Sequence, residues 1–257
     1  MGFSHGLSVV VPVYRSERTL RTLVARISAS LGNQDYEIIL VDDASGDGTW
    51  REISAISIGN TRVKGLRLGR NSGQHSALLA GVRVARFATI ITLDDDLQNP
   101  PEEISKLLAV LTADVDVVYG VSTTIKQNFH RRLGSKVARK FFASMLGFSS
   151  AVSMSSFRVF RTELRNGFDS SLGPNISLDA LLTWSTSRFA VAEVSHDDRA
   201  EGTSHYTFRK LVRFMMDMAT GYSTLPLRMA TAIGFTTIVF GLLLFVLVAG
   251  RPLIYGD

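Results

Sequence analysis

The chain has no cysteine, few prolines and only a small excess of positive charge. Its 257 residues include 6 Pro, and 28 Lys and Arg stand against 23 Asp and Glu, which gives a formal net charge of +5. The lack of cysteine excludes a disulfide scaffold and a cysteine-ligated zinc site. The modest charge and a hydrophobic content of 46% exclude an intrinsically disordered chain. The length is sufficient for one large domain or two small ones.

Charge is also absent from one long stretch near the C-terminus. Residues 230–249 read ATAIGFTTIVFGLLLFVLVA and contain no Asp, Glu, Lys or Arg. A helix that rises about 1.5 Å per residue would extend roughly 30 Å over this stretch, which is the thickness of the hydrocarbon core of a bilayer. We therefore predict a transmembrane helix over 229–250; a buried core helix is the alternative.

Basic residues lie mainly on the N-terminal side of this stretch. Arg209, Lys210, Arg213 and Arg228 precede it, and only Arg251 follows it. Basic flanks stay on the cytoplasmic side of a membrane. The sequence therefore predicts a protein of the cytoplasmic (inner) membrane, with residues 1–206 forming a domain in the cytoplasm.

The residues that lead into the predicted span have an amphipathic pattern. Within 207–222, apolar residues such as Leu211 and Met215 recur at helical spacing, and Arg209 and Arg213 lie on the opposite face. This pattern predicts a juxtamembrane helix over 207–228 that lies in the membrane interface; an ordinary core helix is the alternative. Only seven residues follow Gly250, so we expect a further membrane segment beyond this chain.

The first half of the chain alternates between strand and helix patterns. Strand-like runs cover 7–14, 36–41, 63–68, 87–93 and 114–120, with helical patterns at 17–31, 49–58, 74–86 and 102–112 between them. Such alternation predicts an α/β fold with a mainly parallel, Rossmann-like sheet. Later in the chain, 155–161 and 189–195 are candidate strands.

Acidic clusters follow two of the predicted strands. Asp42 and Asp43 end the second, and Asp94, Asp95 and Asp96 end the fourth. Ligands bind beyond the carboxyl ends of strands in open α/β sheets. Alternate residues project to the same side, so Asp94 and Asp96 can converge on one divalent cation, and oxygen ligands favour Mg²⁺ or Mn²⁺. A solvated acidic turn is the alternative.

Seven segments carry a resemblance to a known family. They are VVVPVY (9–14), VDDASGDGT (41–49), NSGQHSALLAG (71–81), LDDDLQNPPEEI (93–104), SFRVFR (156–161), RAEGTSHY (199–206) and STLPLR (223–228). Together they resemble family 2 glycosyltransferases of the polyprenyl-phosphate branch, which includes dolichol-phosphate mannose synthases. NSGQHSA and DLQNPPEEI are especially similar to bacterial undecaprenyl-phosphate 4-deoxy-4-formamido-arabinose transferases, whereas SSFRVFR is less so.

The resemblance implies a glycosyltransferase type A fold and a set of site residues. The residues that it assigns to the nucleotide sugar are Pro12, Tyr14, Asp42, Asp43, Asn71, Gly73, Gln74, Asp94 and Asp95. Asp94, Asp96 and Gln98 match the metal site. Family members commonly continue P-x-Y with Asn-Glu, where this chain has Arg15 and Ser16, so we expect Glu17 to take over the contact of that Glu.

The implied reaction is inverting transfer of a sugar from a UDP- or GDP-linked donor to a polyprenyl phosphate, for which undecaprenyl phosphate is the first candidate. The leaving diphosphate gains charge, which Mg²⁺ or Mn²⁺ offsets. The acceptor is already an anion, so cationic side chains are needed rather than a strong base. The candidates are Arg131 or Arg132, Arg158, Arg199 and His205, which stands where the family has Lys. With Asp96 they form the expected catalytic set, and His75 is expected to be a packing residue.

Other functions remain as alternatives at this stage. One is a different transferase on the same fold, either polysaccharide-forming or nucleotidyl; another is a non-catalytic membrane scaffold that binds a nucleotide sugar. The basic stretch 126–140 is expected to face anionic lipid rather than nucleic acid, because no nucleic-acid recognition module accompanies it. A homo-oligomer is compatible with the resemblance.

Overall fold

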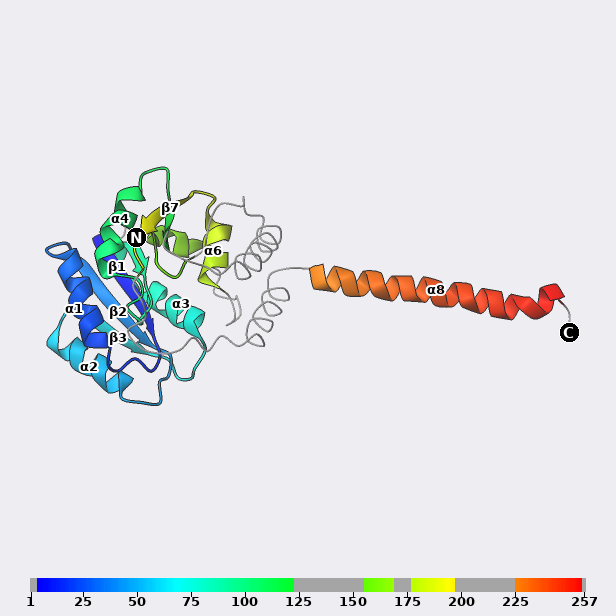
Figure 1. The fold of residues 1–257 in the computed structure, drawn as a ribbon, viewed down its shortest axis with the longest axis horizontal. Coiled ribbons are helices and arrows are strands. Elements are labelled where there is room, and N and C mark those ends of the chain that lie inside the picture. The colour runs from blue at the N-terminus through cyan, green and yellow to red at the C-terminus, as the bar shows by residue number, and fades with distance from the viewer. Residues whose placement is uncertain (1–3, 123–154, 169–176, 197–224, 256–257) are drawn as a thin grey trace. The chain divides into compact units, whose positions relative to one another are not determined.

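A computed structural model of the chain describes residues 4–122, 155–168, 177–196 and 225–255 (Figure 1). The strands are β1 (Ser4–Val13), β2 (Tyr36–Asp42), β3 (Val63–Arg67), β4 (Phe87–Thr92), β5 (Val117–Ser122), β6 (Arg158–Arg161) and β7 (Phe189–Val194). The helices are α1 (Leu20–Leu31), α2 (Thr49–Gly59), α3 (Gln74–Val84), η1 (Pro101–Glu103), α4 (Ile104–Val110), η2 (Thr162–Gly167), α6 (Leu178–Ser185) and α8 (Leu225–Tyr255).

The seven strands form one sheet in the order β3-β2-β1-β4-β6-β5-β7. All neighbouring strands are parallel except at β6, which runs antiparallel to both β4 and β5. The predicted α/β fold with a mainly parallel sheet is therefore confirmed. Because β6 is reversed, its first residue lies beside the last residue of β4: Arg158 is the register partner of Thr92.

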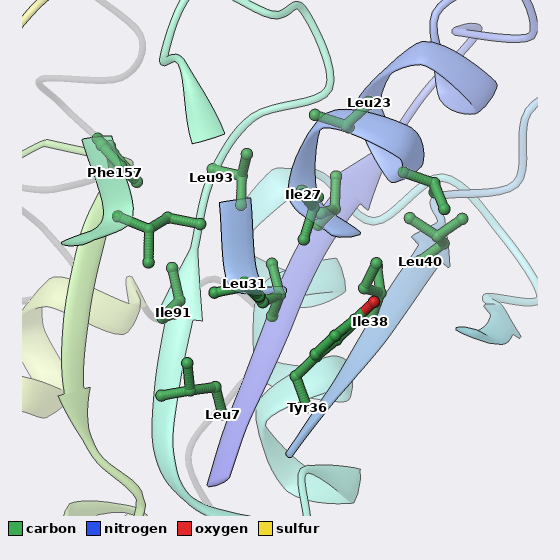
Figure 2. Packing of buried hydrophobic residues seen from close by; sticks show 14 of the residues in the cluster. Leu7, Leu23, Ile27, Leu31, Tyr36, Ile38, Leu40, Ile91, Leu93 and Phe157 are labelled. Carbon is green, nitrogen blue, oxygen red and sulfur yellow. The ribbon is translucent and has the colours of Figure 1, made fainter. Parts of the chain in front are cut away.

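Helices cover both faces of the sheet, which explains why its central strands are apolar on both sides. Along β1, Val9 and Val11 belong to a core cluster with residues of α1, α2 and α4, whereas Val10 belongs to a second cluster with residues of α3 and α6. All three valines are fully buried. Figure 2 shows Leu23 and Ile27 of α1 packed against strand residues of the first cluster. Period-two alternation is absent from β1 because neither face meets solvent.

Two helical elements were not expected from the sequence. Residues 162–167 form η2, and α6 begins at Leu178 after Ser177, whose hydroxyl accepts the backbone N–H of Asp179. Both are short, and a helix of eight residues such as α6 spans only about two turns, which is too little for a clear amphipathic period. The expected helix over 102–112 is divided into η1 and α4.

The chain divides into two units, and the sheet with its helices belongs to the first. The second contains α8, a helix of 31 residues. In the part of the chain that the structure describes, α8 holds the one stretch that is long and apolar enough to cross a membrane, Ala230–Val248. Its side chains are exposed, as Phe245 and Leu247 illustrate, which differs from a core helix. The expected helix over 207–222 and the expected domain boundary after residue 206 lie outside the described residues.

Candidate active site

The carboxyl ends of β1, β2 and β4 meet at one edge of the sheet, because the three strands are parallel neighbours. Each strand is followed by a loop in which a residue other than glycine adopts a left-handed backbone: Arg15 (φ 56°), Ala44 (φ 53°) and Leu97 (φ 62°). Such conformations cost on the order of 1 kcal/mol or more each, and they cluster at functional sites. These three loops therefore mark this edge of the sheet as the candidate site.

Asp43 fixes the start of α3. Its two carboxylate oxygens accept the backbone N–H groups of Ser72 at 2.7 Å and Gly73 at 2.8 Å, and its backbone carbonyl accepts the Asn71 amide at 3.3 Å. Gly73 has φ 88°, a conformation that favours glycine. The predicted residues Asp43, Asn71 and Gly73 are thus brought together, with Asp43 serving the backbone around them.

Asp42 is fully buried at the end of β2. It accepts the backbone N–H of Ser45 at 2.9 Å and lies 3.3 Å from the Arg67 guanidinium. The hydroxyl of Ser45 in turn accepts the backbone N–H of Arg15 at 2.9 Å. Asp42 therefore supports the β1–α1 loop through Ser45, while Tyr14 in that loop is 45% exposed. Pro12 is buried within β1.

Both carboxylate oxygens of Asp94 have protein donors. The Gln74 amide at the start of α3 donates to one at 2.6 Å, and the Ser156 hydroxyl, two residues before β6, donates to the other. Asp96 accepts the backbone N–H of Gln98 at 3.1 Å. Donors of this kind orient metal-binding carboxylates without occupying all their lone pairs.

The middle residue of the acidic triplet faces another way. The carboxylate of Asp95 accepts the backbone N–H of Tyr14 at 3.1 Å and the hydroxyl of Ser16. Burial raises the pKa of Asp95 to about 6, against the opposing effect of these two donors. Asp95 and Asp96 lie in a turn rather than in an extended segment, and the Asp95 carboxylate is directed toward the β1–α1 loop.

The donor set fits a hard divalent cation. Asp94 and Asp96 offer carboxylate oxygens, and none of the described residues forms a group of three or more His, Asp or Glu side chains that could hold a metal ion by itself. Mg²⁺ and Mn²⁺ commonly bind to one or two carboxylates, with substrate phosphates and water completing their coordination. Two carboxylates at the edge of the sheet are what such a site requires.

Glu17 pairs with a residue of α2 rather than with the acidic triplet. Its carboxylate pairs with the Arg51 guanidinium of α2 at 3.0 Å and lies over Gly48, where a β-carbon would collide with it. Ser16, and not Glu17, provides the side chain that contacts the Asp95 carboxylate from this loop, beside the backbone N–H of Tyr14. No local pattern indicates this contact, because it joins residues 79 positions apart.

Arg158 is buried at the start of β6, with 2% of its side chain exposed. Its guanidinium pairs with Asp179 of α6 and donates from Nε to the Thr92 hydroxyl at 3.1 Å. The Tyr119 hydroxyl also donates to Asp179, at 2.8 Å. Sequence reasoning missed Tyr119 and Asp179, and it placed Arg158 among the phosphate-binding cations; in the structure its charge is matched by Asp179.

His75 lies in the first turn of α3, near Arg158 and Asp179. Burial lowers its pKa, and the neighbouring charges of Asp179 and Arg158 act in opposite directions on it. Its Nδ1 is buried without a hydrogen-bond partner. A neutral, mostly buried imidazole agrees with the expected packing role. Arg131, Arg132, Arg199 and His205 lie outside the described residues.

This fold and edge define a class of protein. A Rossmann-like sheet with aspartates after β4 that fit a divalent cation is the arrangement of glycosyltransferase type A enzymes. The family model "Glycosyl transferase family 2" matches residues 8–167. The chain belongs to that family and is a glycosyltransferase.

Curated relatives match nearly the whole chain. An undecaprenyl-phosphate 4-deoxy-4-formamido-L-arabinose transferase of Proteus mirabilis is 35% identical over 97% of this chain and 78% of its own length. The protein of the same name from Pectobacterium atrosepticum is 34% identical over 97% of this chain and 77% of its own.

Solved structures agree on the fold. Glucosyl-3-phosphoglycerate synthase from Mycobacterium tuberculosis, in complex with Mg²⁺ and UDP, has a TM-score of 0.64 at 18% identity, covering 86% of this chain and 80% of that one. The same enzyme with Mn²⁺, UDP-glucose and phosphoglyceric acid has a TM-score of 0.61 at 18% identity, covering 85% and 79%.

Proposed function

We propose that the chain transfers a sugar, with inversion, from a nucleotide-sugar donor to a polyprenyl phosphate at the cytoplasmic face of the inner membrane. The proposal rests on one observation: the chain is 35% identical, over 97% of its length, to an undecaprenyl-phosphate sugar transferase. We take undecaprenyl phosphate as the first candidate acceptor. UDP is the first candidate nucleotide, because structures of the same fold hold UDP.

The metal-binding part of the proposal rests on Asp94 and Asp96, with Gln98 as the third expected ligand. Gln74 and Ser156 hold the Asp94 carboxylate in place through their hydrogen bonds. A bound Mg²⁺ or Mn²⁺ would offset the charge of the leaving diphosphate. We assign contact with the nucleoside to Tyr14, which is 45% exposed and whose backbone N–H donates to the neighbouring Asp95.

The acceptor side follows from charge. A lipid phosphate needs no general base, because its oxygen is already ionised at neutral pH, whereas bringing two anions together needs cations. We assign the binding of the acceptor phosphate to Arg131 or Arg132, Arg199 and His205. To Arg158, whose guanidinium is buried against Asp179, we assign a structural role instead. The apolar stretch Ala230–Val248 would anchor the chain in the membrane that contains the acceptor.

The test is transfer of labelled sugar to undecaprenyl phosphate by the full chain in detergent or liposomes, with a panel of UDP- and GDP-sugars and Mn²⁺. We expect labelled lipid with at least one donor, and Asp96→Ala should reduce the rate by a hundredfold or more. Asp114→Ala is the matched control, because Asp114 is exposed before β5 at the opposite edge of the sheet. Undiminished transfer by Asp96→Ala would contradict the proposed metal site.

A further inference from the structure

The middle carboxylate of the acidic triplet is tied to a different part of the site from its neighbours. Asp94 is bound by Gln74 and Ser156, from α3 and from the residues before β6. Asp95 is instead bound by the β1–α1 loop, through the backbone N–H of Tyr14 and the hydroxyl of Ser16. Its backbone carbonyl also accepts the hydroxyl of Thr19, at 3.0 Å. Three hydrogen bonds thus connect one residue to a loop some 80 positions earlier.

The β1–α1 loop depends on contacts of this kind. The N–H of Arg15 donates to Ser45 at 2.9 Å, and the N–H of Ser16 donates to the hydroxyl of Thr49 at 3.1 Å. Asp95 provides the contact on the other side, at Tyr14. Arg15, between Tyr14 and Ser16, has a left-handed backbone. This conformation costs free energy and persists only where surrounding contacts offset that cost.

We propose that Asp95 is a positioning residue that links the metal-binding aspartates to the nucleotide-binding loop and is not itself a metal ligand. Its carboxylate accepts the backbone N–H of Tyr14, the residue that the proposed function assigns to the nucleoside. Ser16, which replaces the Glu that the family resemblance leads one to expect, provides the hydroxyl for this link. The inference rests on the proposed function. It assigns to Asp95 the positioning of the β1–α1 loop, which metal binding by Asp94 and Asp96 does not itself require.

The link between Asp95 and the β1–α1 loop predicts that loss of the Asp95 carboxylate changes the donor KM and leaves the acceptor KM and the Mn²⁺ activation constant nearly unchanged. Asp95→Ala should raise the donor KM about tenfold, because two hydrogen bonds to the loop are lost. The acceptor KM should stay within about twofold of the wild type. The Mn²⁺ activation constant, measured at ten times the donor KM of each variant, should also stay within about twofold, whereas Asp96→Ala should raise it by tenfold or more.

Conservative variants separate positioning from general structural support. Asp95→Asn keeps an acceptor oxygen and Ser16→Thr keeps the hydroxyl, so both should recover most of the donor affinity. Ser16→Ala should raise the donor KM about threefold, and the double variant Asp95→Ala/Ser16→Ala should be no worse than Asp95→Ala, since both changes break the same link. Additive effects in the double variant, or equal losses in donor KM, acceptor KM and kcat, would overturn the inference.

A second measurement does not depend on catalysis. In hydrogen–deuterium exchange of the full chain without nucleotide, Asp95→Ala should speed exchange in the peptide that contains residues 14–19, while Asp114→Ala should not. If the wild type neither bound UDP with Mn²⁺ nor transferred sugar, the proposed function would fail, and faster exchange would still support the link. Unchanged exchange in Asp95→Ala, or a rise in the Mn²⁺ constant equal to that of Asp96→Ala, would refute it.

Discussion

At the scale of single residues, the site depends on neutral side chains as much as on carboxylates. Asp94 has a donor on each oxygen, the Gln74 amide at 2.6 Å and the Ser156 hydroxyl. Neither donor carries charge, so neither competes with a cation for the carboxylate. Both limit the orientations that the side chain can adopt, which would lower the entropic cost of binding a cation in the proposed metal site.

Replacement of Gln74 should therefore weaken metal binding without removing a ligand. We expect Gln74→Ala to raise the Mn²⁺ activation constant about tenfold, the usual effect of losing a group that orients a ligand. The measurement is transfer rate against Mn²⁺ concentration, and Gln34→Ala, in an exposed turn before β2, is the matched control. An activation constant equal to that of the control would show that the hydrogen bond has no such role.

A second residue of interest is Glu37, buried at the start of β2. Burial acts to raise its pKa, but hydrogen bonds from Lys64, the Arg86 backbone and Ser8 outweigh it and hold the pKa below the ordinary value of glutamate. Lys64 lies 2.7 Å from the carboxylate. The unfolded chain binds the proton more readily, so this contribution to stability is present near neutral pH and is lost as the pH falls through the lowered pKa.

Thermal unfolding between about pH 5 and pH 3 tests this contribution. The wild-type Tm should fall over that window, and Glu37→Gln should have a lower Tm at pH 7 but a flatter dependence below pH 5. Glu193→Gln changes an exposed glutamate of β7 and should keep the wild-type slope. Parallel curves for wild type and Glu37→Gln would contradict the assignment.

At the scale of elements, β6 and α6 are joined by a buried ion pair. Arg158 and Asp179 have side chains that are 2% and 14% exposed, and Tyr119 of β5 donates to the same aspartate. A buried ion pair stabilises a fold little more than apolar residues of similar size would. Loss of one partner is costly, however, because the other charge then remains in the interior without its counter-charge. The pair therefore fixes where α6 lies against the sheet.

Arg158→Met should destabilise the fold by roughly 3–5 kcal/mol, because it leaves the largely buried Asp179 carboxylate without its counter-charge. Arg158→Met/Asp179→Leu should recover a large part of that loss. The comparison is Arg188→Met, which removes a half-exposed partner of Asp116 and should cost less. The measurement is denaturant unfolding in detergent; a double variant less stable than Arg158→Met would contradict this account.

At the scale of the whole molecule, the chain combines a sheet domain with a long apolar helix. If Ala230–Val248 crosses a membrane, an arginine near its middle is costly, by about 3 kcal/mol, whereas one at its end can extend its head group to the interface. Val239→Arg should therefore reduce the fraction of chain that resists carbonate extraction from membranes. Ala230→Arg is the control, and equal extraction of the two variants would argue against a span.

The features that could be predicted from sequence are those that local pattern determines. Buried strands such as β1 are apolar throughout, and parallel strands place Asp42 and Asp94 at one edge whatever the details of packing. The reversal of β6, the helix α6 and the partner of Arg158 depend on contacts between residues far apart in the chain, as do the Ser16–Asp95 and Ser156–Asp94 hydrogen bonds. No local signal encodes such contacts.

Because all the strands but β6 run in the same direction, a label can be attached at the edge of the sheet opposite Asp94. Every loop that follows a parallel strand leaves from the edge that carries Asp94, and the reversed β6 starts from that edge. The opposite edge holds return turns, such as the exposed residues 32–35 between α1 and β2. A fluorophore or a surface tether attached at Asn33 would leave the acidic edge facing solution, which suits single-molecule measurements of donor binding.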